Sequence, residues 1–113
     1  MHRSRITRGE DFQKIIRKGI RVGGEYVVTH AVFSSNEDKT RFGFVVSKRV
    51  GNAVQRNLIK RRLTGITYEV PEDLVTGLDI VFRAKPESLT ASYAELKQDV
   101  IRQLSKIKSR VKL

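Results

Sequence analysis

The side chains best suited to binding chemistry form one continuous basic segment. Between Asp38 and Glu69 the chain carries eight Lys or Arg residues and no acid. Cations fixed on a turn and on the helix after it neutralise phosphates and release their counterions, which gives affinity for nucleic acid without dependence on its sequence. The segment therefore predicts nucleic acid as the partner of this chain.

The spacing within this segment predicts a tight turn followed by a helix. Gly51 can take the positive φ of a tight turn, and Asn52 can cap a helix that has Gln55 at the third position after it. We therefore expect a helix from about Ala53. With about 100° between successive residues, its core-facing stripe consists of Ile59, Leu63 and Ile66.

The polar residues of the segment divide between the turn and one surface of the expected helix. Lys48 and Arg49 lie beside the first helical amides, where unpaired donors and the positive end of the helix dipole favour an anion. Arg56, Asn57 and Lys60 share a surface next to the apolar stripe. A helix that serves only solubility interleaves Glu with Lys at four-residue spacing. The missing acids favour binding of an external polyanion over the alternative, a set of merely solvated cations.

These residues also carry a resemblance to a known family. The run Gly43–Arg62 (GFVVSKRVGNAVQRNLIKRR) resembles the signature of the bacterial ribonuclease P protein component, and the likeness covers nearly the whole chain. The family usually has Arg-Asn-Arg as its central triplet, whereas this chain has Leu58 in the third place. The resemblance implies that the third basic contact is lost or has moved to Arg61 or Arg62. It implies RNA contacts by Lys48, Arg49, Arg56, Asn57, Lys60 and Arg61.

The resemblance also implies a division of labour with RNA. In this family the RNA subunit holds the catalytic magnesium ions and cleaves precursor tRNA at its mature 5′ end. The protein binds the RNA subunit and the single-stranded 5′ leader of the substrate, which requires cations and sequence-tolerant stacking surfaces. The family places an aromatic pair on the first helix; Phe12 matches the first position and Ile16 occupies the second. Lys85 matches a basic position after the last strand. The alternatives are core packing for Phe12 and Ile16 and simple solvation for Lys85.

The titratable residues form no catalytic centre in the sequence pattern. A metal-dependent nuclease needs at least two carboxylates that converge on its ions. The twelve acids are scattered, and neighbours such as Glu10 and Asp11 do not face each other on a helix. His2 and His30 each lack a second ligand nearby in the sequence. We expect no catalytic residue, metal site or cofactor in the protein itself, and we expect Mg²⁺ to be required by the holoenzyme.

Length and composition fit a single RNA-binding domain over residues 1–113. A chain of 113 residues can bury one hydrophobic core. Its formal net charge of +11 favours a protein that is bound to a polyanion. Cysteine is absent, which fits a reducing compartment. No apolar stretch is long enough to span a membrane, and the N-terminus lacks the apolar region of a secretory signal. We therefore expect a cytoplasmic protein without a membrane partner.

The N-terminal half predicts a helix and two strands. Thr7 and Glu10 are spaced as a capping box, and Gly19 ends the helix that follows. β-Branched and aromatic residues predict a strand over 26–34, and alternation predicts a second over 42–47, with one face made of Phe42, Phe44 and Val46. The polar residues 34–40 between them are expected to form a hairpin loop that pairs the two strands.

The C-terminal half predicts one strand and one helix. Gly77 precedes an apolar strand over 78–84, and Ser92 with Glu95 caps a helix from about Tyr93. The core stripe of that helix is Leu96, Val100, Leu104 and Ile107.

The order helix-strand-strand-helix-strand-helix predicts an α+β fold, a single-domain sandwich of helices on a small mixed β-sheet. The strands on either side of the basic helix are separated by a full helix, so we expect them to be parallel and joined by a βαβ crossover. General rules favour a right-handed crossover, whereas the resemblance implies a left-handed one.

Three other functions are alternatives to that of a ribonuclease P protein component. A ribosomal-protein-like module or RNA chaperone without a role in cleavage would also be basic and free of cysteine, but a longer disordered basic tail would be expected. A DNA-binding regulator is disfavoured, and no DNA partner is expected, because the basic helix follows a strand ending at Ser47 instead of a helix and a short turn. An independent ribonuclease is disfavoured because converging carboxylates are missing from the pattern.

Overall fold

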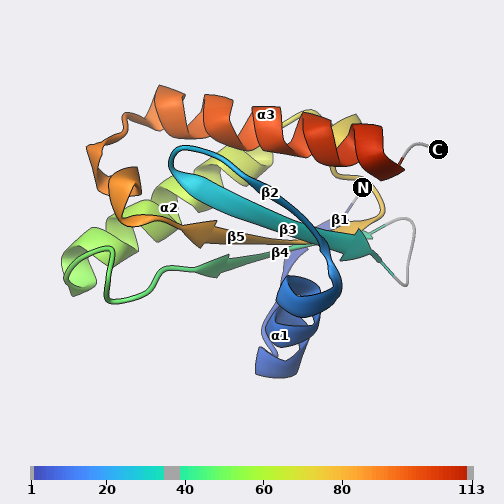
Figure 1. Ribbon diagram of the computed structural model, residues 1–113, viewed down its shortest axis with the longest axis horizontal. Coiled ribbons are helices and arrows are strands. Elements are labelled where there is room, and N and C mark those ends of the chain that lie inside the picture. Colours follow the sequence, from blue (N-terminus) through green and yellow to red (C-terminus); the bar gives the residue numbers. More distant parts are fainter. Residues whose placement is uncertain (1, 35–38, 112–113) are drawn as a thin grey trace.

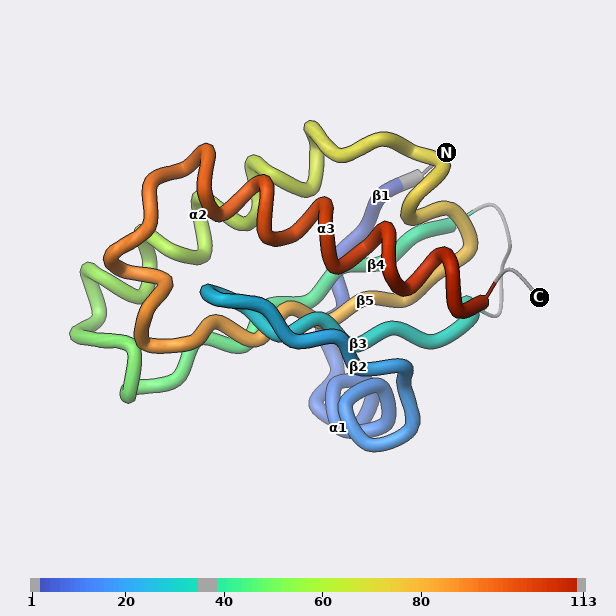
Figure 2. The backbone as a smooth tube through the Cα atoms, turned by 45° about the horizontal axis from the view of Figure 1, so that its top comes forward, coloured from blue at the N-terminus to red at the C-terminus, as the bar shows by residue number. Residues whose placement is uncertain are grey.

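A computed structural model describes residues 2–34 and 39–111 of the chain, and for residue 2 only the backbone (Figure 1). A five-stranded mixed sheet lies between two layers of helix. Two long helices cover one face of the sheet and a short helix packs against the other, as Figure 2 shows from a second direction. The predicted α+β class is confirmed. In chain order the elements are β1 (His2–Arg5), α1 (Gly9–Lys18), β2 (Ile20–Gly23), β3 (Val27–Phe33), β4 (Lys39–Val45), α2 (Ala53–Glu69), η1 (Glu72–Leu74), β5 (Leu78–Ala84), η2 (Pro86–Thr90) and α3 (Tyr93–Val111).

The sheet has the strand order β1-β4-β5-β3-β2. β4 and β5 are parallel and are connected through α2, which confirms the predicted crossover between parallel strands. The predicted pairing of β3 with β4 is wrong, because β5 lies between them and pairs antiparallel with β3. β5 has buried side chains from Leu78 to Phe82, and a strand buried on both faces belongs in the middle of a sheet. Within the predicted hairpin loop 34–40, positions 35–38 lie outside the described residues.

The two edge strands, β1 and β2, were not predicted. β1 has the sequence HRSR, which carries no apolar alternation, and it forms because it pairs in parallel with β4. Arg3 ties this strand to the end of α2 by donating hydrogen bonds to the carbonyl oxygens of Thr67 and, at 3.2 Å, Val70. β2 is four residues long and pairs antiparallel with β3. Pairing with a neighbour, which a single segment cannot reveal, defines both edges.

Two local predictions at turns are wrong. The N-cap of α1 is Arg8, without a side-chain cap, instead of the predicted box of Thr7 and Glu10. The amide of Ile6 still donates to the Phe42 carbonyl at 2.8 Å, so strand pairing continues past β1 and delays the helix. Gly51 does not have the predicted positive φ. In the described part of the chain Gly77 alone has one, with φ 79°.

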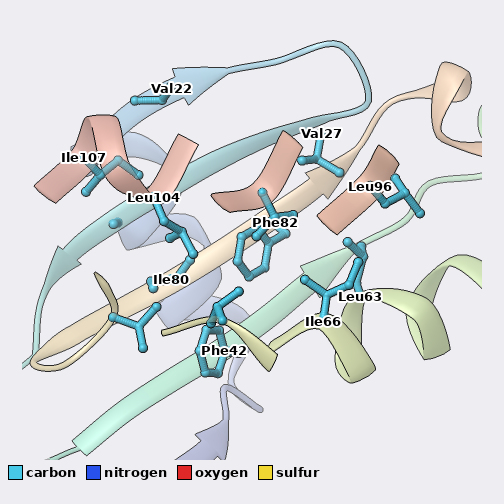
Figure 3. Packing of buried hydrophobic residues seen from close by; sticks show 14 of the residues in the cluster. Val22, Val27, Phe42, Leu63, Ile66, Ile80, Phe82, Leu96, Leu104 and Ile107 are labelled. Atoms are coloured by element: carbon cyan, nitrogen blue, oxygen red, sulfur yellow. The ribbon is translucent and has the colours of Figure 1, made fainter. Parts of the chain in front are cut away.

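The main core lies between the sheet and the helices α2 and α3 (Figure 3). Phe82 of β5 is at its centre, with ring centroids 6.1 Å from Phe42 and 6.0 Å from Phe44. The stripes predicted for the two long helices are buried against it, which confirms both helix faces: Ile59, Leu63 and Ile66 on α2, and Leu96, Val100, Leu104 and Ile107 on α3. The predicted cap of α3 is also present, because Ser92 and Glu95 exchange hydrogen bonds.

A smaller apolar cluster lies on the opposite face of the sheet. Ile15 of α1 packs there on Ile6 and on Val81 of β5, with the half-buried Phe12 and Ile16 beside them. α1 is ten residues long and covers only part of this face. The remaining part is open and basic, and it forms one of the two grooves described below. No helix among the described residues is long and apolar enough to cross a bilayer.

Candidate nucleic-acid interface

A groove of about 680 Å³ runs along the exposed side of α2, and we call it the α2 groove. Its cations come from α2 itself and from the neighbouring edge strand β1. The lining residues are Arg5, Val54, Asn57, Lys60, Arg61 and Thr64. Three of the six predicted RNA contacts, Asn57, Lys60 and Arg61, therefore lie in one groove.

The N-terminal cap of α2 and its buried stripe determine which side chains of the helix face the α2 groove. Asn52 accepts a hydrogen bond from the Gln55 amide, and Gln55 accepts one from the Asn52 amide, each at 2.9 Å, so the predicted capping box is confirmed. A Cβ at Gly51 would lie 2.2 Å from Oε1 of Gln55, so the glycine leaves room for the cap. Because Ile59 and Leu63 are turned into the core, the polar residues between them face outward.

Arg5 is a member of the α2 groove that the sequence did not indicate. Its guanidinium carbon lies 5.5 Å from the centroid of the Phe44 ring, within the range of a cation–π interaction. β1 brings it there through the pairing of Arg5 with Phe42 of β4. Nothing in the N-terminal sequence alone signals this, because the partner strand is about forty residues away.

The other predicted RNA contacts lie outside the α2 groove. Lys48 and Arg49 are exposed on the turn before α2. Arg56 is half-buried and donates a hydrogen bond of 2.8 Å to the Gly51 carbonyl, so it holds that turn. Leu58, which stands where the family usually has Arg, is half-buried.

Arg61 and Arg62, the two positions to which the third basic contact could have moved, differ in their surroundings. Arg61 is exposed and lines the α2 groove. Arg62 donates a hydrogen bond of 3.1 Å to the Ala91 carbonyl and so connects α2 to the segment before α3. Arg61 is therefore the better placed of the two for RNA.

A second groove, of about 440 Å³, lies over the part of the sheet that α1 leaves uncovered, and we call it the sheet groove. Val28 of β3 forms part of its lining together with four cations and one acid, Glu87. The ammonium of Lys85 donates to the Gly24 carbonyl at 3.2 Å, which holds it at the rim. The cations are Arg21, Arg49, Arg83 and Lys85. The structure thus brings together Arg49, predicted as an RNA contact, and Lys85, predicted for the leader site.

Phe12 and Ile16, predicted for the leader site, lie on α1 beside the same face of the sheet. A Cβ at Gly43 would be 2.5 Å from Cε1 of Phe12, so the ring rests directly on the backbone of β4. Both side chains are half-buried against the smaller apolar cluster. Neither lines the sheet groove, and their contact with a leader stays a prediction.

The sequence did not indicate two arginines of the sheet groove or the histidine beside them. Arg21 is on β2 and Arg83 is on β5, and both face the groove. His30 lies between them on β3, where its Nε2 accepts a hydrogen bond of 3.0 Å from Nε of Arg83. Burial, with the nearby charges of Arg83 and Arg21, lowers the pKa of His30 to about 4. The three strands that carry these residues can be aligned only when the strand order is known.

The carboxylates do not form a metal site among the described residues, where no group of three or more His, Cys, Asp or Glu could hold an ion. Asp79 of β5 accepts two hydrogen bonds from Arg41, at 3.0 and 2.7 Å, and Asp11 lies 3.4 Å from the same guanidinium. The hydrogen bonds to Asp79 raise the pKa of Arg41. These two acids are occupied by a permanent cation and do not fit a protein-held Mg²⁺.

Comparison with known proteins agrees with this geometry. The family model "Ribonuclease P" matches residues 1–108. The chain is 40% identical over 110 residues to the ribonuclease P protein component of Beutenbergia cavernae, covering 97% of this chain and 92% of the relative. It is 42% identical over 97 residues to that of Pseudarthrobacter chlorophenolicus, covering 86% and 71%.

Solved structures show the same architecture. The RNase P protein of Staphylococcus aureus superposes with a TM-score of 0.81 at 30% identity, covering 92% of this chain and 94% of that one. The RNase P protein of Thermotoga maritima has the same fold, with a TM-score of 0.77 at 24% identity over 90% and 96%. From the match of nearly its whole length, this chain belongs to the ribonuclease P protein family.

Proposed function

We propose that this chain is the protein subunit of a cytoplasmic ribonuclease P ribonucleoprotein. It binds the catalytic RNA subunit and the 5′ leader of precursor tRNA, and it promotes endonucleolytic removal of the leader to make the mature tRNA 5′ end. The observation that carries the proposal is the presence of two basic grooves without a lining residue in common, one beside α2 and one on the open sheet face. A protein that bridges two RNAs needs two such surfaces.

The α2 groove suits the structured RNA subunit. Its cations are held on a capped helix and on a paired strand, so they form a fixed array. Double-helical RNA is recognised mainly through phosphates and 2′-hydroxyl groups, which requires cations and hydrogen-bonding side chains such as Asn57 and does not require a stacking surface. The exposed Lys60 and Arg61 meet that requirement.

The sheet groove suits an unpaired leader. It combines four cations with apolar side chains such as Val28, and single-stranded RNA binds where cations follow the phosphates beside flat surfaces for the bases. α1 borders the same face of the sheet and presents the half-buried ring of Phe12. Leaders differ in sequence between precursors, and contacts of this kind do not depend on sequence.

The chemistry of cleavage is assigned to the RNA subunit and its Mg²⁺. The described residues of the protein include no group of three or more His, Cys, Asp or Glu that could hold an ion, and the carboxylates of Asp79 and Asp11 both contact Arg41. The protein contributes binding free energy. A leader contact is present with precursor tRNA and absent with mature tRNA, so it favours the substrate over the product.

The proposal is tested by reconstitution. The pure chain, the RNA subunit from the same organism, and their mixture are each incubated with precursor tRNA at physiological Mg²⁺. We expect efficient cleavage at the mature 5′ end from the mixture alone. Cleavage by the chain without RNA would show an independent nuclease. Equal stimulation by an unrelated basic RNA chaperone would show that the chain acts only on RNA folding.

A further inference from the structure

His30 is a buried polar residue in the middle of the sheet with one hydrogen bond. Only 2% of its surface is exposed, and Nε2 accepts from Nε of Arg83 at 3.0 Å. Its other ring nitrogen, Nδ1, is buried and has no hydrogen-bond partner among the residues that the structure describes. A buried polar group that has only one of its two hydrogen bonds costs stability, so packing alone does not account for a histidine at this place.

The hydrogen bond defines the protonation state of the ring. A guanidinium has N–H donors and no acceptor, so Arg83 is the donor and Nε2 of His30 must carry a lone pair. The ring is then neutral, with its proton on Nδ1. Burial is the main reason that the pKa of His30 is lowered to about 4, and the charges of Arg83 and Arg21 act in the same direction. His30 therefore accepts from Arg83 over the whole physiological pH range.

A second arginine next to β5, Arg41, has a charged partner where Arg83 has a neutral one. At the other end of the strand, Asp79 binds Arg41 as an ion pair at 2.7 Å, which orients the guanidinium and also neutralises it. Arg83 has a neutral partner instead, and among the described residues it forms no ion pair. A neutral acceptor orients a guanidinium and leaves its full charge available for an external anion.

We propose that Arg83 contacts a phosphate of the leader in the sheet groove, and that His30 is the positioning residue that orients Arg83 without neutralising it. Arg83 lines the groove, and its terminal nitrogens can bind two phosphate oxygens while Nε is held by His30. Arg21, the cross-strand partner of His30, adds a second cation at the same place. The inference rests on the proposed function, because it assigns these residues to the leader.

The test measures the affinity of the reconstituted holoenzyme for precursor tRNA and for the same tRNA without its leader. We expect Arg83→Met to reduce the ratio of the two affinities by roughly tenfold, the equivalent of about 1.4 kcal/mol. His30→Leu should reduce it by a similar factor, because Arg83 loses its orientation. His30→Gln should restore most of the ratio, because the amide oxygen can take the place of Nε2. In the double variant of His30→Leu with Arg83→Met, the loss should equal that of Arg83→Met alone.

Lys106→Met is the matched control, since Lys106 is exposed on α3, which covers the other face of the sheet. It should leave the ratio unchanged. Any unfolded fraction lowers both affinities equally and cancels in the ratio. An unchanged ratio in Arg83→Met, or additive losses in the double variant, would overturn the inference while the wild type still prefers the leader. A wild type that binds both RNAs equally would instead overturn the proposed function.

Discussion

The three cations of the α2 groove make a quantitative prediction for the salt dependence of assembly. Arg5, Lys60 and Arg61 line one groove, and each can neutralise one phosphate of the RNA subunit. Each phosphate contact adds roughly 0.7 to 0.9 to the slope of log affinity against log salt concentration. Lys60→Ala should lower the slope by one such step. The triple alanine variant should lower it by roughly 2 to 3.

This difference is large enough to measure without ambiguity. Over a fourfold rise in salt, the wild type should lose roughly 20 to 40 times more affinity than the triple variant. The assay is equilibrium binding of the labelled RNA subunit to the chain across a salt series, with circular dichroism of each variant to verify folding. Lys106→Ala removes an exposed cation outside both grooves and should change the slope by much less. A folded triple variant with the wild-type slope, or an equal fall in Lys106→Ala, would refute the assignment of the α2 groove to RNA.

Three further predictions concern single residues. Phe12→Ala should weaken holoenzyme binding of precursor tRNA by about 1 to 3 kcal/mol and leave mature tRNA binding unchanged if the ring stacks on a base; equal losses for both RNAs in a folded variant would assign the ring to packing alone. Leu58→Arg should be tolerated and tighten RNA binding, because Leu58 is half-buried next to a helix surface that already carries cations; a stability loss of several kcal/mol in chemical denaturation would show a buried, unpaired charge instead. The pKa of His30 is about 4 in the folded chain against an ordinary 6.5, so the unfolded chain binds a proton first as the pH falls. The contribution of His30 to the free energy of unfolding should be fully present above about pH 7 and decline by up to about 3 kcal/mol between pH 6.5 and 4. His30→Gln should lack this part of the pH dependence, and identical stability profiles for variant and wild type would refute the neutral buried ring.

The parts of the molecule that the sequence predicted have local signals. α2 begins at Ala53 because Asn52 and Gln55 cap each other within four residues. Its buried stripe follows from a period that lies within one element. The same holds for α3 with its cap at Ser92. For these elements, neighbouring residues contain all the information that the prediction needs.

The parts that were missed depend on contacts between distant segments. β1 has no apolar pattern and exists because β4 pairs with it, so the contribution of Arg5 to the α2 groove could not be seen. β5 separates β3 from β4, and this insertion places Arg83 opposite Val28 and next to His30. The sheet groove therefore cannot be assembled from the sequence, although the sequence predicts an RNA contact for Arg49 and a leader contact for Lys85.

The central claim, that the two grooves bind different RNAs, is tested most directly by site-specific crosslinking in the assembled particle. The chain has no cysteine, so single cysteines can carry a photoreactive group. Thr64→Cys places it in the α2 groove and Glu87→Cys in the sheet groove, with Ser105→Cys on the exposed side of α3 as the control. We predict that position 64 labels the RNA subunit and that position 87 labels the leader of precursor tRNA. Labelling of the same RNA from both grooves, or of the leader from position 64, would contradict the account.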